Sequence, residues 1–598
     1  MKPAVRIGCG AGFWGDSGEG PSQLVESGEI DYLVLDYLAE ITMSLLARAR
    51  AKDPQAGYAT DFPELIARLA PQLKARGIRV VSNAGGVHPE ACRAAIEQRL
   101  AALGVSLRVA IVTGDDLLPR AAEFADCREM FSAAALPAKL WSMNAYLGAF
   151  PIAAALDAGA DIVLTGRCVD SAETLGALIH EFRWSAQDFD LLAAGSLAGH
   201  VIECGAQATG GIATDWRAAV ADWDRMGFPI AICRPDGRFI ATKPAGSGGR
   251  VVPETIAEQI VYEIGDPAAY LLPDVSCDFR AVQLRAVGPD RVEVSGARGH
   301  APGAHYKVSA TWQDGYRSGG TMMIGGVDAV AKAEAVAEAI LRRTRRLFAA
   351  RGLADYRRSD VELLGTESNW GANARRRDTR ELILKLNVHH DERAALEIFS
   401  REFIPPATAM AQGITGFAGG RPSTTPMVRL FSCLVPKSAV PIAIDGQPYL
   451  PPAVEYGAAQ RSPASTVPVA ALEGPTTMVP LIALAYGRSG DKGDLCNIGV
   501  LARRPEFLPL LQAQLGADAV RGYLGHFVQG RAERFDWPGL GGFNFVLHEA
   551  LGGGGTASLR HDPQGKLMAQ ILMDFPMTVP RAWCAAGGLL EGADGDPR

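Results

Sequence analysis

The sequence lacks several features that mark specialised classes of protein. Its ten cysteines form no Cys-x-x-Cys pair, which disfavours zinc ribbons and iron–sulfur clusters. It contains no apolar run long enough for a membrane helix, and a strand is predicted from residue 5, so a secretory signal is not expected. Lysine and arginine form no long run and the net charge is −7, so we expect a cytoplasmic protein with neither nucleic acid nor membrane as a partner.

Motifs of two common enzyme classes are also missing, and a third is incomplete where it is counted from Gly8. In that register, Phe13 stands where a dinucleotide-binding Gly-x-Gly-x-x-Gly loop needs its third glycine. Residues 487–494 lack the order of a Walker A loop, and the chain contains no Gly-x-Ser-x-Gly nucleophile elbow. Nicotinamide dehydrogenases and serine hydrolases are therefore disfavoured.

The 598 residues, 48% hydrophobic and 21% charged, make a globular chain that is too long for one core. Changes in sequence pattern predict four parts along it. They are an α/β ligand-binding part at 1–228, an α+β part rich in strands at 229–435, a proline-rich linker at 436–480 and a small α+β domain at 481–598.

Strands and helices alternate through the first part. Short loops join them, which is typical of a mostly parallel sheet covered by helices on both faces. Buried strands are predicted at 30–36, 78–82, 107–112 and 161–165, and helices at 62–76, 89–103 and 148–158.

Glycine and polar residues gather where each predicted strand passes into its helix. In a parallel sheet these points share the carboxyl-terminal edge, where such folds bind ligands. We therefore expect one ligand site along that edge. The residues are Gly10, Gly12, Asp36, Glu40, Asn83, Gly85, Gly86, Asp115, Asp116, Arg167 and Asp170.

The glycine loop at 8–20 follows the first strand and precedes a helix that starts near Pro21. Backbone N–H groups and a helix N-terminus in this arrangement bind phosphate or carboxylate. We predict that an anionic substrate is held by Arg167 and contacted by Gly10, Gly12, Trp14, Asn83, Gly85 and Gly86.

Carboxylates and a histidine near the same edge predict general acid–base chemistry, since burial raises a carboxyl pKa toward neutrality. Two alternatives stay open. One is a divalent-metal site of oxygen ligands with one histidine. In the other, Glu40 and Glu173 cap helices and Asp36 pairs with a buried arginine such as Arg167. The predicted catalytic residues are Asp36, Glu40, Asp170, His200 and Glu203.

Two histidine motifs lie further along the chain. The glycines around His200 and Glu203 favour a loop, although on a helix the two side chains would share one face. His389 and His390 are predicted in a turn, followed by a helix that Asp391 caps.

The segment 487–494 is predicted as a loop that follows a strand. Its Arg488 and Lys492 would bind an anion, either a phosphate of CoA or a carboxylate of the substrate. Because two aspartates alternate with the two basic residues, a salt-bridged hairpin turn is the alternative.

Motifs spread over the chain resemble the acyclic terpene utilisation (AtuA) family. They are the loop at 8–20, Asp31–Glu40, Asn83–Gly86, Thr165–Asp170, Gly199–Gly205 and Asp314–Arg317. The motif Arg488–Asp494 is similar to the ferredoxin-like domain that is often fused to this family.

The resemblance implies catabolism of branched or isoprenoid acids as CoA thioesters. With the predicted site, it points to a lyase, hydratase or isomerase that acts on a small carboxylate or an acyl-CoA by acid–base chemistry. The alternative is a non-catalytic CoA-ester-binding or accessory protein that docks a partner enzyme of the pathway. CoA as part of the substrate, a divalent metal and a homo-oligomer are left open, and no other cofactor is implied.

Overall fold

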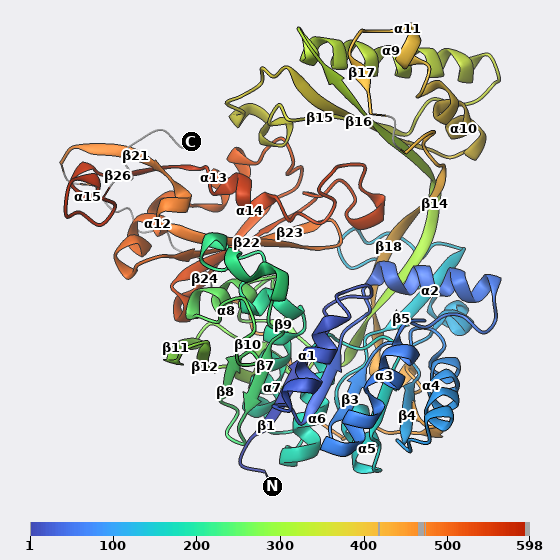
Figure 1. Cartoon of the computed structure of the whole chain (residues 1–598), viewed down its shortest axis with the longest axis vertical. Helices are drawn as coiled ribbons and strands as arrows, with labels where there is room; N and C mark the ends of the chain where they lie inside the picture. The colour runs from blue at the N-terminus through green and yellow to red at the C-terminus, as the bar shows by residue number, and fades with distance from the viewer. Residues whose placement is uncertain (1, 417–418, 464–471, 473, 592–598) are drawn as a thin grey trace.

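The computed structural model describes every residue except 1, 417–418, 464–471, 473 and 592–598 (Figure 1). A sheet of eleven strands fills the lower part of Figure 1. Five parallel strands form its centre. In spatial order they are β1 (Val5–Cys9), β2 (Tyr32–Leu35), β3 (Arg79–Ser82), β6 (Ile162–Thr165) and β4 (Val109–Thr113).

Helices cover both faces of this sheet, because successive side chains of a strand point to opposite sides. In β2, Leu33 and Leu35 pack on one side and Val34 packs on the other. The predicted parallel α/β fold is therefore confirmed. The first face is covered by α1 (Glu19–Ser27), α2 (Glu40–Lys52), α3 (Phe62–Arg76) and α4 (Pro89–Leu103), and the second by α5 (Phe150–Asp157), α6 (Ala172–Phe182) and α7 (Phe189–Ile202).

The helices α3 and α4 begin and end at the predicted residues. Gly77 ends α3 with φ of 66°, a left-handed conformation that glycine adopts without steric cost. Helix α7 differs from its prediction, since it continues through Gly199 and includes His200. Burial of its apolar residues outweighs the low helix propensity of glycine, so the predicted loop is wrong.

Antiparallel strands extend the sheet at both edges. At one edge lie β7 (Ile230–Cys233), β8 (Phe239–Thr242), β12 (Arg291–Ser295) and β11 (Gln283–Gly288), and at the other β19 (Ala443–Ile444) and β20 (Gln447–Pro448). The sheet thus takes strands from both sides of residue 228 and from the segment predicted as a linker. Residues 464–471 and 473 of that segment lie outside the described part of the chain.

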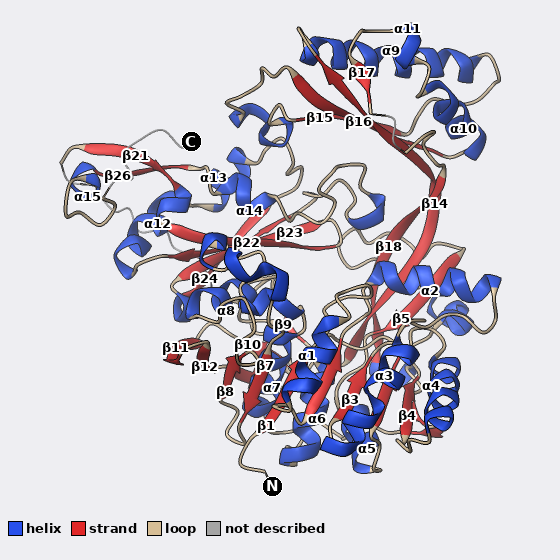
Figure 2. Cartoon of the chain, in the orientation of Figure 1, coloured by secondary structure: helices blue, strands red, loops and turns tan. Residues whose placement is uncertain are grey.

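One long strand, β14 (His305–Gly325), runs from this body to the lobe at the top of Figure 1. Its first part pairs with β5 (Leu140–Ala145) and β18 (Thr425–Pro436), and its second part with β16 (Glu381–His390) and β17 (Ile414–Thr415). The lobe is completed by β15 (Arg358–Leu364), α9 (Ala329–Ala349), α10 (Arg393–Glu402) and α11 (Pro406–Ala409) (Figure 2).

The histidine pair predicted in a turn lies at the end of β16 instead. Both rings are buried, and the Nε2 atoms of His389 and His390 contact backbone carbonyl oxygens at 2.7 and 3.0 Å. Asp391 does not cap α10 but pairs with Arg357 Nη1 at 3.1 Å. Pairing with β14 on one side and β15 on the other keeps these residues in the strand.

The C-terminal domain is a four-stranded antiparallel sheet with a core of its own, in agreement with the predicted small α+β domain. The sheet order is β22 (Ala485–Lys492), β23 (Leu495–Ala502), β25 (Gly542–Leu547) and β24 (Ala532–Trp537). Around it lie α12 (Leu508–Gln514), α13 (Ala517–Tyr523), α14 (Met568–Leu572), α15 (Arg581–Cys584) and the strand pair β21 (Thr476–Pro480) and β26 (Pro576–Pro580).

Two predictions in this domain are wrong. The loop predicted at 487–494 is mostly the strand β22, which turns into β23 at Gly493 with φ of 68°. The sequence pattern of residues 566–573 predicts a further strand, but the structure has the helix α14 there, which packs its apolar side into the domain core. In both places tertiary contacts override the local pattern.

The β-rich section also contains a helix that the pattern does not predict, α8 (Pro253–Ile260). It is followed by a small sheet of β9 (Tyr270–Leu271), β10 (Ser276–Asp278) and β13 (Arg298–His300). The end of α8 contacts the C-terminal domain, where Asn497 Nδ2 donates to the carbonyl oxygen of Val261 at 2.8 Å.

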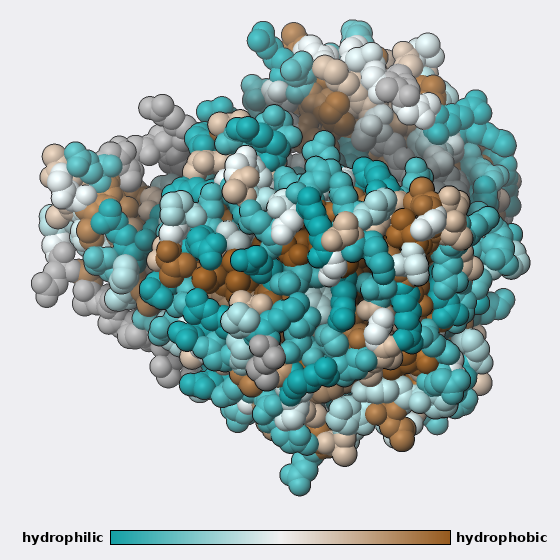
Figure 3. Space-filling model, turned by 60° about the horizontal axis from the view of Figure 1, so that its bottom comes forward, coloured by the Kyte–Doolittle hydropathy of each residue, from teal (hydrophilic) through white to brown (hydrophobic). Residues whose placement is uncertain are grey.

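No described helix is both long and apolar enough to cross a bilayer. The longest one, α9, carries charged residues along its length. Hydrophilic residues cover most of the face that Figure 3 shows, with separate apolar patches between them.

Candidate active site

The carboxyl ends of the parallel strands meet along one edge. Asp36 follows β2 and Asn83 follows β3, and Asn83 Nδ2 donates a hydrogen bond to Asp36 Oδ1 at 2.5 Å. Gly10 follows β1, and its N–H donates to a carbonyl oxygen of β2 at 2.9 Å. Asp115 and Arg167 follow β4 and β6, and the Arg167 N–H donates to Asp115 Oδ2 at 2.8 Å. The topology thus brings these polar residues together.

Two carboxyl groups at this edge are fully enclosed. Burial raises the pKa of Asp36, and the charge of Asp170 raises it further, although Arg167 opposes them. Burial likewise raises the pKa of Glu173. The Glu173 carboxyl accepts the N–H groups of Leu35 at 3.2 Å and Asn83 at 2.8 Å, so it ties the ends of β2 and β3 together.

Arg167 is held at the centre of the cluster with one donor unused. Its Nη1 donates to Asp170 Oδ1 at 2.9 Å, and its guanidinium lies 4.3 Å from the centre of the Tyr146 ring. Burial alone would lower the pKa of Arg167, but the charges of Asp170 and other acids raise it. The buried Nε has no hydrogen-bond partner among the described residues, so it remains available to a ligand.

Beside Arg167, a lysine and a tyrosine converge on one carboxylate. Glu40 is the first residue of α2, Tyr146 follows β5 and Lys307 lies on β14. Lys307 Nζ lies 3.3 Å from Glu40 Oε1, and the Tyr146 hydroxyl donates to the same oxygen. Burial would raise the pKa of Glu40, but the charges of Lys307, Arg167 and Lys492 hold it well below its usual range. Glu40 is therefore an ionised anchor.

His200 and Glu203 form a buried pair within the cluster. His200 Nε2 lies 3.1 Å from the carbonyl oxygen of Ile260, which can only accept, so we infer that Nε2 carries a hydrogen. The remaining His200 Nδ1 and Glu203 Oε1, 3.1 Å apart, then share one proton. Burial raises the pKa of Glu203 to about 7, although His200 opposes this. For His200, burial would lower the pKa, but the charge and hydrogen bond of Glu203 raise it.

The C-terminal domain contributes Lys492, at the end of β22. Its Nζ pairs with Glu263 Oε2 at 2.9 Å, and its charge acts on Glu40, Asp170 and His200. Water reaches these groups, because the side chains of Lys492, Lys307, Asp170 and Glu40 are 44%, 35%, 26% and 25% exposed. The cluster is therefore open to a ligand from solvent.

The glycine loop has a different role from the predicted anion cradle. A Cβ on Gly10 would lie 3.0 Å from Pro21 Cα, and one on Gly12 would lie 2.7 Å from the carbonyl carbon of Cys204. These glycines allow the loop to pack against α1 and the end of α7. The Gly12 N–H is already bonded to Asp16 Oδ2 at 3.0 Å. Two of the predicted anion contacts are thus engaged within the protein.

Four other predicted anion contacts are also engaged within the protein. Trp14 Nε1 donates to Asp61 Oδ1 at 2.6 Å, away from the cluster. Cβ atoms on Gly85 and Gly86 would lie 2.6 Å and 2.5 Å from backbone oxygens, so both glycines serve close packing. Arg488, on β22 of the C-terminal domain, pairs with Glu258 Oε2 of α8 at 3.6 Å.

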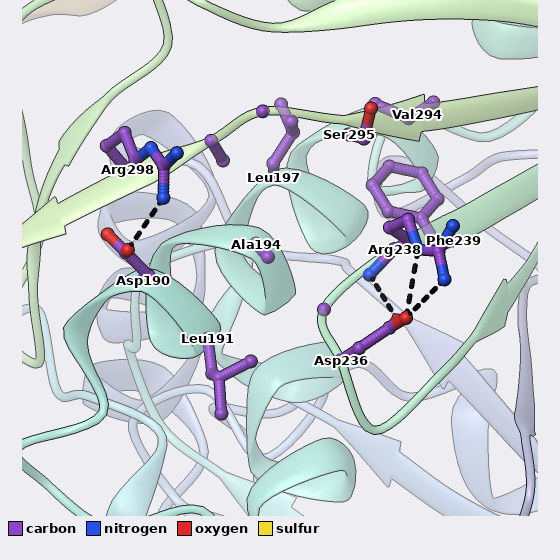
Figure 4. A pocket seen from close by; sticks show the side chains of 13 residues that line it. Asp190, Leu191, Ala194, Leu197, Asp236, Arg238, Phe239, Val294, Ser295 and Arg298 are labelled. Carbon is purple, nitrogen blue, oxygen red and sulfur yellow. Dashed lines mark hydrogen bonds and ion pairs between the residues drawn. The ribbon is translucent and has the colours of Figure 1, made fainter.

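A separate pocket of about 160 Å³ lies at the opposite end of α7 from His200 (Figure 4). The charged residues that line it pair with one another: Arg298 pairs with Asp190 at 2.9 Å, and Arg238 pairs with Asp236 at 2.6 Å. Charges already neutralised in this way leave little to bind a polar ligand.

Sequence reasoning missed four members of the cluster: Tyr146, Lys307, Glu263 and Tyr270. The Tyr270 ring lies 5.7 Å from the His200 ring, and burial keeps its pKa high, so its hydroxyl stays neutral. Lys307 and Tyr146 come together through the pairing of β14 with β5. No local motif marks that pairing, and only the three-dimensional topology reveals it.

The cluster combines a buried carboxyl with a pKa of about 7, an ionised carboxylate and three cations, of which Lys307 and Lys492 are reached by water. Among the described residues, no group of three histidine, cysteine, aspartate or glutamate side chains is placed to hold a metal ion.

These features define an α/β protein with a cluster of acidic, basic and histidine side chains between its core and an appended α+β domain. Residues 5–445 match the model of the acyclic terpene utilisation family protein AtuA, and residues 479–578 match that of the AtuA ferredoxin-like domain. The chain belongs to the AtuA family, and the resemblance seen in its motifs is confirmed. Comparison with curated proteins and with solved structures finds no match.

Proposed function

We propose that this protein is a catabolic enzyme that acts on a branched or isoprenoid carboxylate, or on its CoA thioester, as a lyase, hydratase or isomerase. The family description supports the catabolic role, since it names the utilisation of acyclic terpenes. The charged cluster at the strand ends supports the type of reaction.

One observation carries the proposal, namely the free carboxyl oxygen of Glu203. Oε1 contacts His200, whereas the buried Oε2 has no hydrogen-bond partner among the described residues. With a pKa of about 7, this carboxyl both accepts and donates a proton readily at neutral pH. It is the group of the cluster best suited to exchange a proton with a substrate.

Lyases, hydratases and isomerases of such acids share proton transfer at the carbon next to the carbonyl. In the proposed mechanism Glu203 accepts that proton, and the electron pair moves onto the carbonyl oxygen. Lys307 and Arg167 stabilise the negative charge that develops there. The pair then returns to form a double bond as the protonated Glu203 gives up its proton, either to a β-hydroxyl group that leaves as water or to another carbon of an unsaturated acyl chain.

The substitution Glu203→Gln tests this mechanism. It preserves the shape but removes the base, so we expect exchange of the α-hydrogen with D₂O, measured by NMR, to fall about 10²- to 10⁴-fold. In the wild type the exchange rate should rise with pH through about 7, because the ionised form is the base. Substrates are 3-hydroxy-3-methylbutyryl-CoA and its free acid.

A matched control is Glu293→Gln on β12, whose carboxylate pairs with Arg285 at the far edge of the main sheet. This variant should exchange at the wild-type rate. An unchanged rate in Glu203→Gln would remove Glu203 from the mechanism. Binding of CoA esters without any exchange, together with co-purification of another enzyme of the pathway, would favour the accessory role.

A further inference from the structure

A cavity of about 680 Å³ lies between the second half of α2 and the first half of β5. This is the size of a pocket that encloses a small-molecule ligand. Most of its lining is apolar, as in typical ligand pockets. The apolar residues are Ala47, Ala51, Val87, Leu118, Pro119, Leu140 and Trp141.

The polar part of the lining is strongly positive. Arg48, Arg50 and Lys52 line the cavity from α2, against a single acid, Asp116. The Asp116 carboxylate accepts the N–H of a neighbouring residue at 3.0 Å, and burial raises its pKa, although the charge of Arg50 opposes this. Among the described residues neither Arg48 nor Lys52 has an ion-pair partner, so both charges are available.

A flat aromatic surface lies among these cations. The Arg48 guanidinium lies 4.9 Å from the centre of the Trp141 ring, the geometry of a cation–π contact. An indole ring beside unpaired cations matches a ligand with a planar ring and phosphate groups. Bases stack on such rings, and arginine and lysine bind phosphates.

The same two elements connect this cavity to the acid–base cluster. Glu40 is the first residue of α2, and Tyr146 follows directly after β5. Seven to twelve residues of helix separate Glu40 from Ala47 and Lys52, which corresponds to roughly 10 to 18 Å. A ligand that occupies both places therefore needs a long arm between its phosphorylated ring and its reacting carbonyl.

We propose that the cavity binds the nucleotide of a CoA thioester, with the adenine against Trp141 and the phosphates at Arg48 and Lys52. The pantetheine arm then follows α2 and β5 to the cluster, where the acyl group reacts. This inference rests on the proposed function and decides its substrate class, since it selects the acyl-CoA over the free acid.

Titration calorimetry of the full chain tests the cavity with CoA and with adenosine 3′,5′-bisphosphate, which lacks the pantetheine arm. Both should bind the wild type. Trp141→Leu should weaken both by about tenfold, the loss expected when a base loses its stacking partner. Arg48→Ala should weaken both and reduce the dependence of binding on salt concentration.

The chain offers close controls for both variants. Arg217 lies 4.5 Å over the Trp216 ring, outside the cavity, so Trp216→Leu removes a similar aromatic–arginine pair. Arg285→Ala removes an exposed arginine from β11. Neither should change CoA binding. Arg48→Ala keeps the test decisive if Trp141→Leu fails to fold.

Absence of CoA binding, or binding that Trp141→Leu and Arg48→Ala leave unchanged, would overturn the proposal. Binding of CoA without binding of the bisphosphate would also overturn it, because the pantetheine arm would then carry the affinity. Exchange on the free acid as fast as on the thioester contradicts the cavity inference but leaves the proposed function intact. CoA binding that depends on Trp141, without any α-hydrogen exchange, contradicts the proposed function but leaves the cavity inference intact.

Discussion

Two groups of charged residues join the C-terminal domain to the rest of the chain, and they differ in their access to water. In the first, Arg488 lies 3.6 Å from Glu258, with side chains only 4% and 2% exposed. In the second, Lys492 reaches the cluster around Lys307 and Glu40, where the side chains are 44%, 35% and 25% exposed. We call the first the dry clamp and the second the wet cluster.

The difference assigns the two groups to different tasks. Within the dry clamp, Glu258 also accepts the N–H and hydroxyl of Thr214 at 3.0 and 3.1 Å, and Arg488 donates to Gln207 at 3.0 Å. This ion pair is closed to water, although Arg488 Nε and Nη2 make no hydrogen bond with a described residue. In the wet cluster the buried Arg167 Nε and Glu203 Oε2 also lack a partner among the described residues, but they lie beside charges that water reaches. Charges that water reaches, beside groups without partners, are typical of a binding site.

Breaking the dry clamp should give the largest loss of stability. Arg488→Met leaves Glu258 as a buried charge without its cation, which costs about 3 to 5 kcal/mol. Urea unfolding should show this loss. The double variant Arg488→Met, Glu258→Gln should recover part of it, because no uncompensated charge remains. Equal stability of Arg488→Met and the wild type would mean that the clamp does not hold the domains together.

The strand ends of the wet cluster could be predicted from the sequence because they depend on a local pattern. Asp36, Asn83 and Arg167 each follow a predicted strand, and parallel pairing alone brings them to one edge. Lys492 could be predicted as well, because the motif at 487–494 predicts an anion contact. The prediction nevertheless gave Arg488 the same role, because spacing does not tell which of two basic residues meets a buried acid.

Other members depend on contacts that no local pattern encodes. Lys307 joins the cluster only because β14 pairs with β5. The glycine loop is the opposite case, since its spacing resembles an anion cradle but two of its glycines lie against the protein's own backbone. Only the positions of Pro21 and Cys204 show that Gly10 and Gly12 are needed for packing. The sequence therefore predicts well which edge of the sheet carries polar groups. It predicts less well which of those groups face a ligand.

A variant of the wet cluster should separate activity from stability. Lys307→Met removes a cation from the developing negative charge, so α-hydrogen exchange should fall about 10²-fold. Its unfolding free energy should change by less than about 1 kcal/mol, because the pair with Glu40 is partly exposed. Steady-state kinetics and urea unfolding of the same preparation measure both. If Lys307→Met lost much of its stability but kept a normal rate of α-hydrogen exchange, the wet cluster would stabilise the fold and would not be the reacting site.

The smallest effect is expected at Lys492, the most exposed cation of the wet cluster. Because water and salt screen it, Lys492→Gln should raise KM about threefold to tenfold at low salt and leave kcat nearly unchanged. The difference from the wild type should shrink as salt is added, whereas Lys492→Arg should keep both the affinity and its salt dependence. KM measured at several ionic strengths decides the matter. A fall in kcat as large as that of Glu203→Gln would instead make Lys492 part of the proton transfer, and the C-terminal domain would then supply a catalytic group.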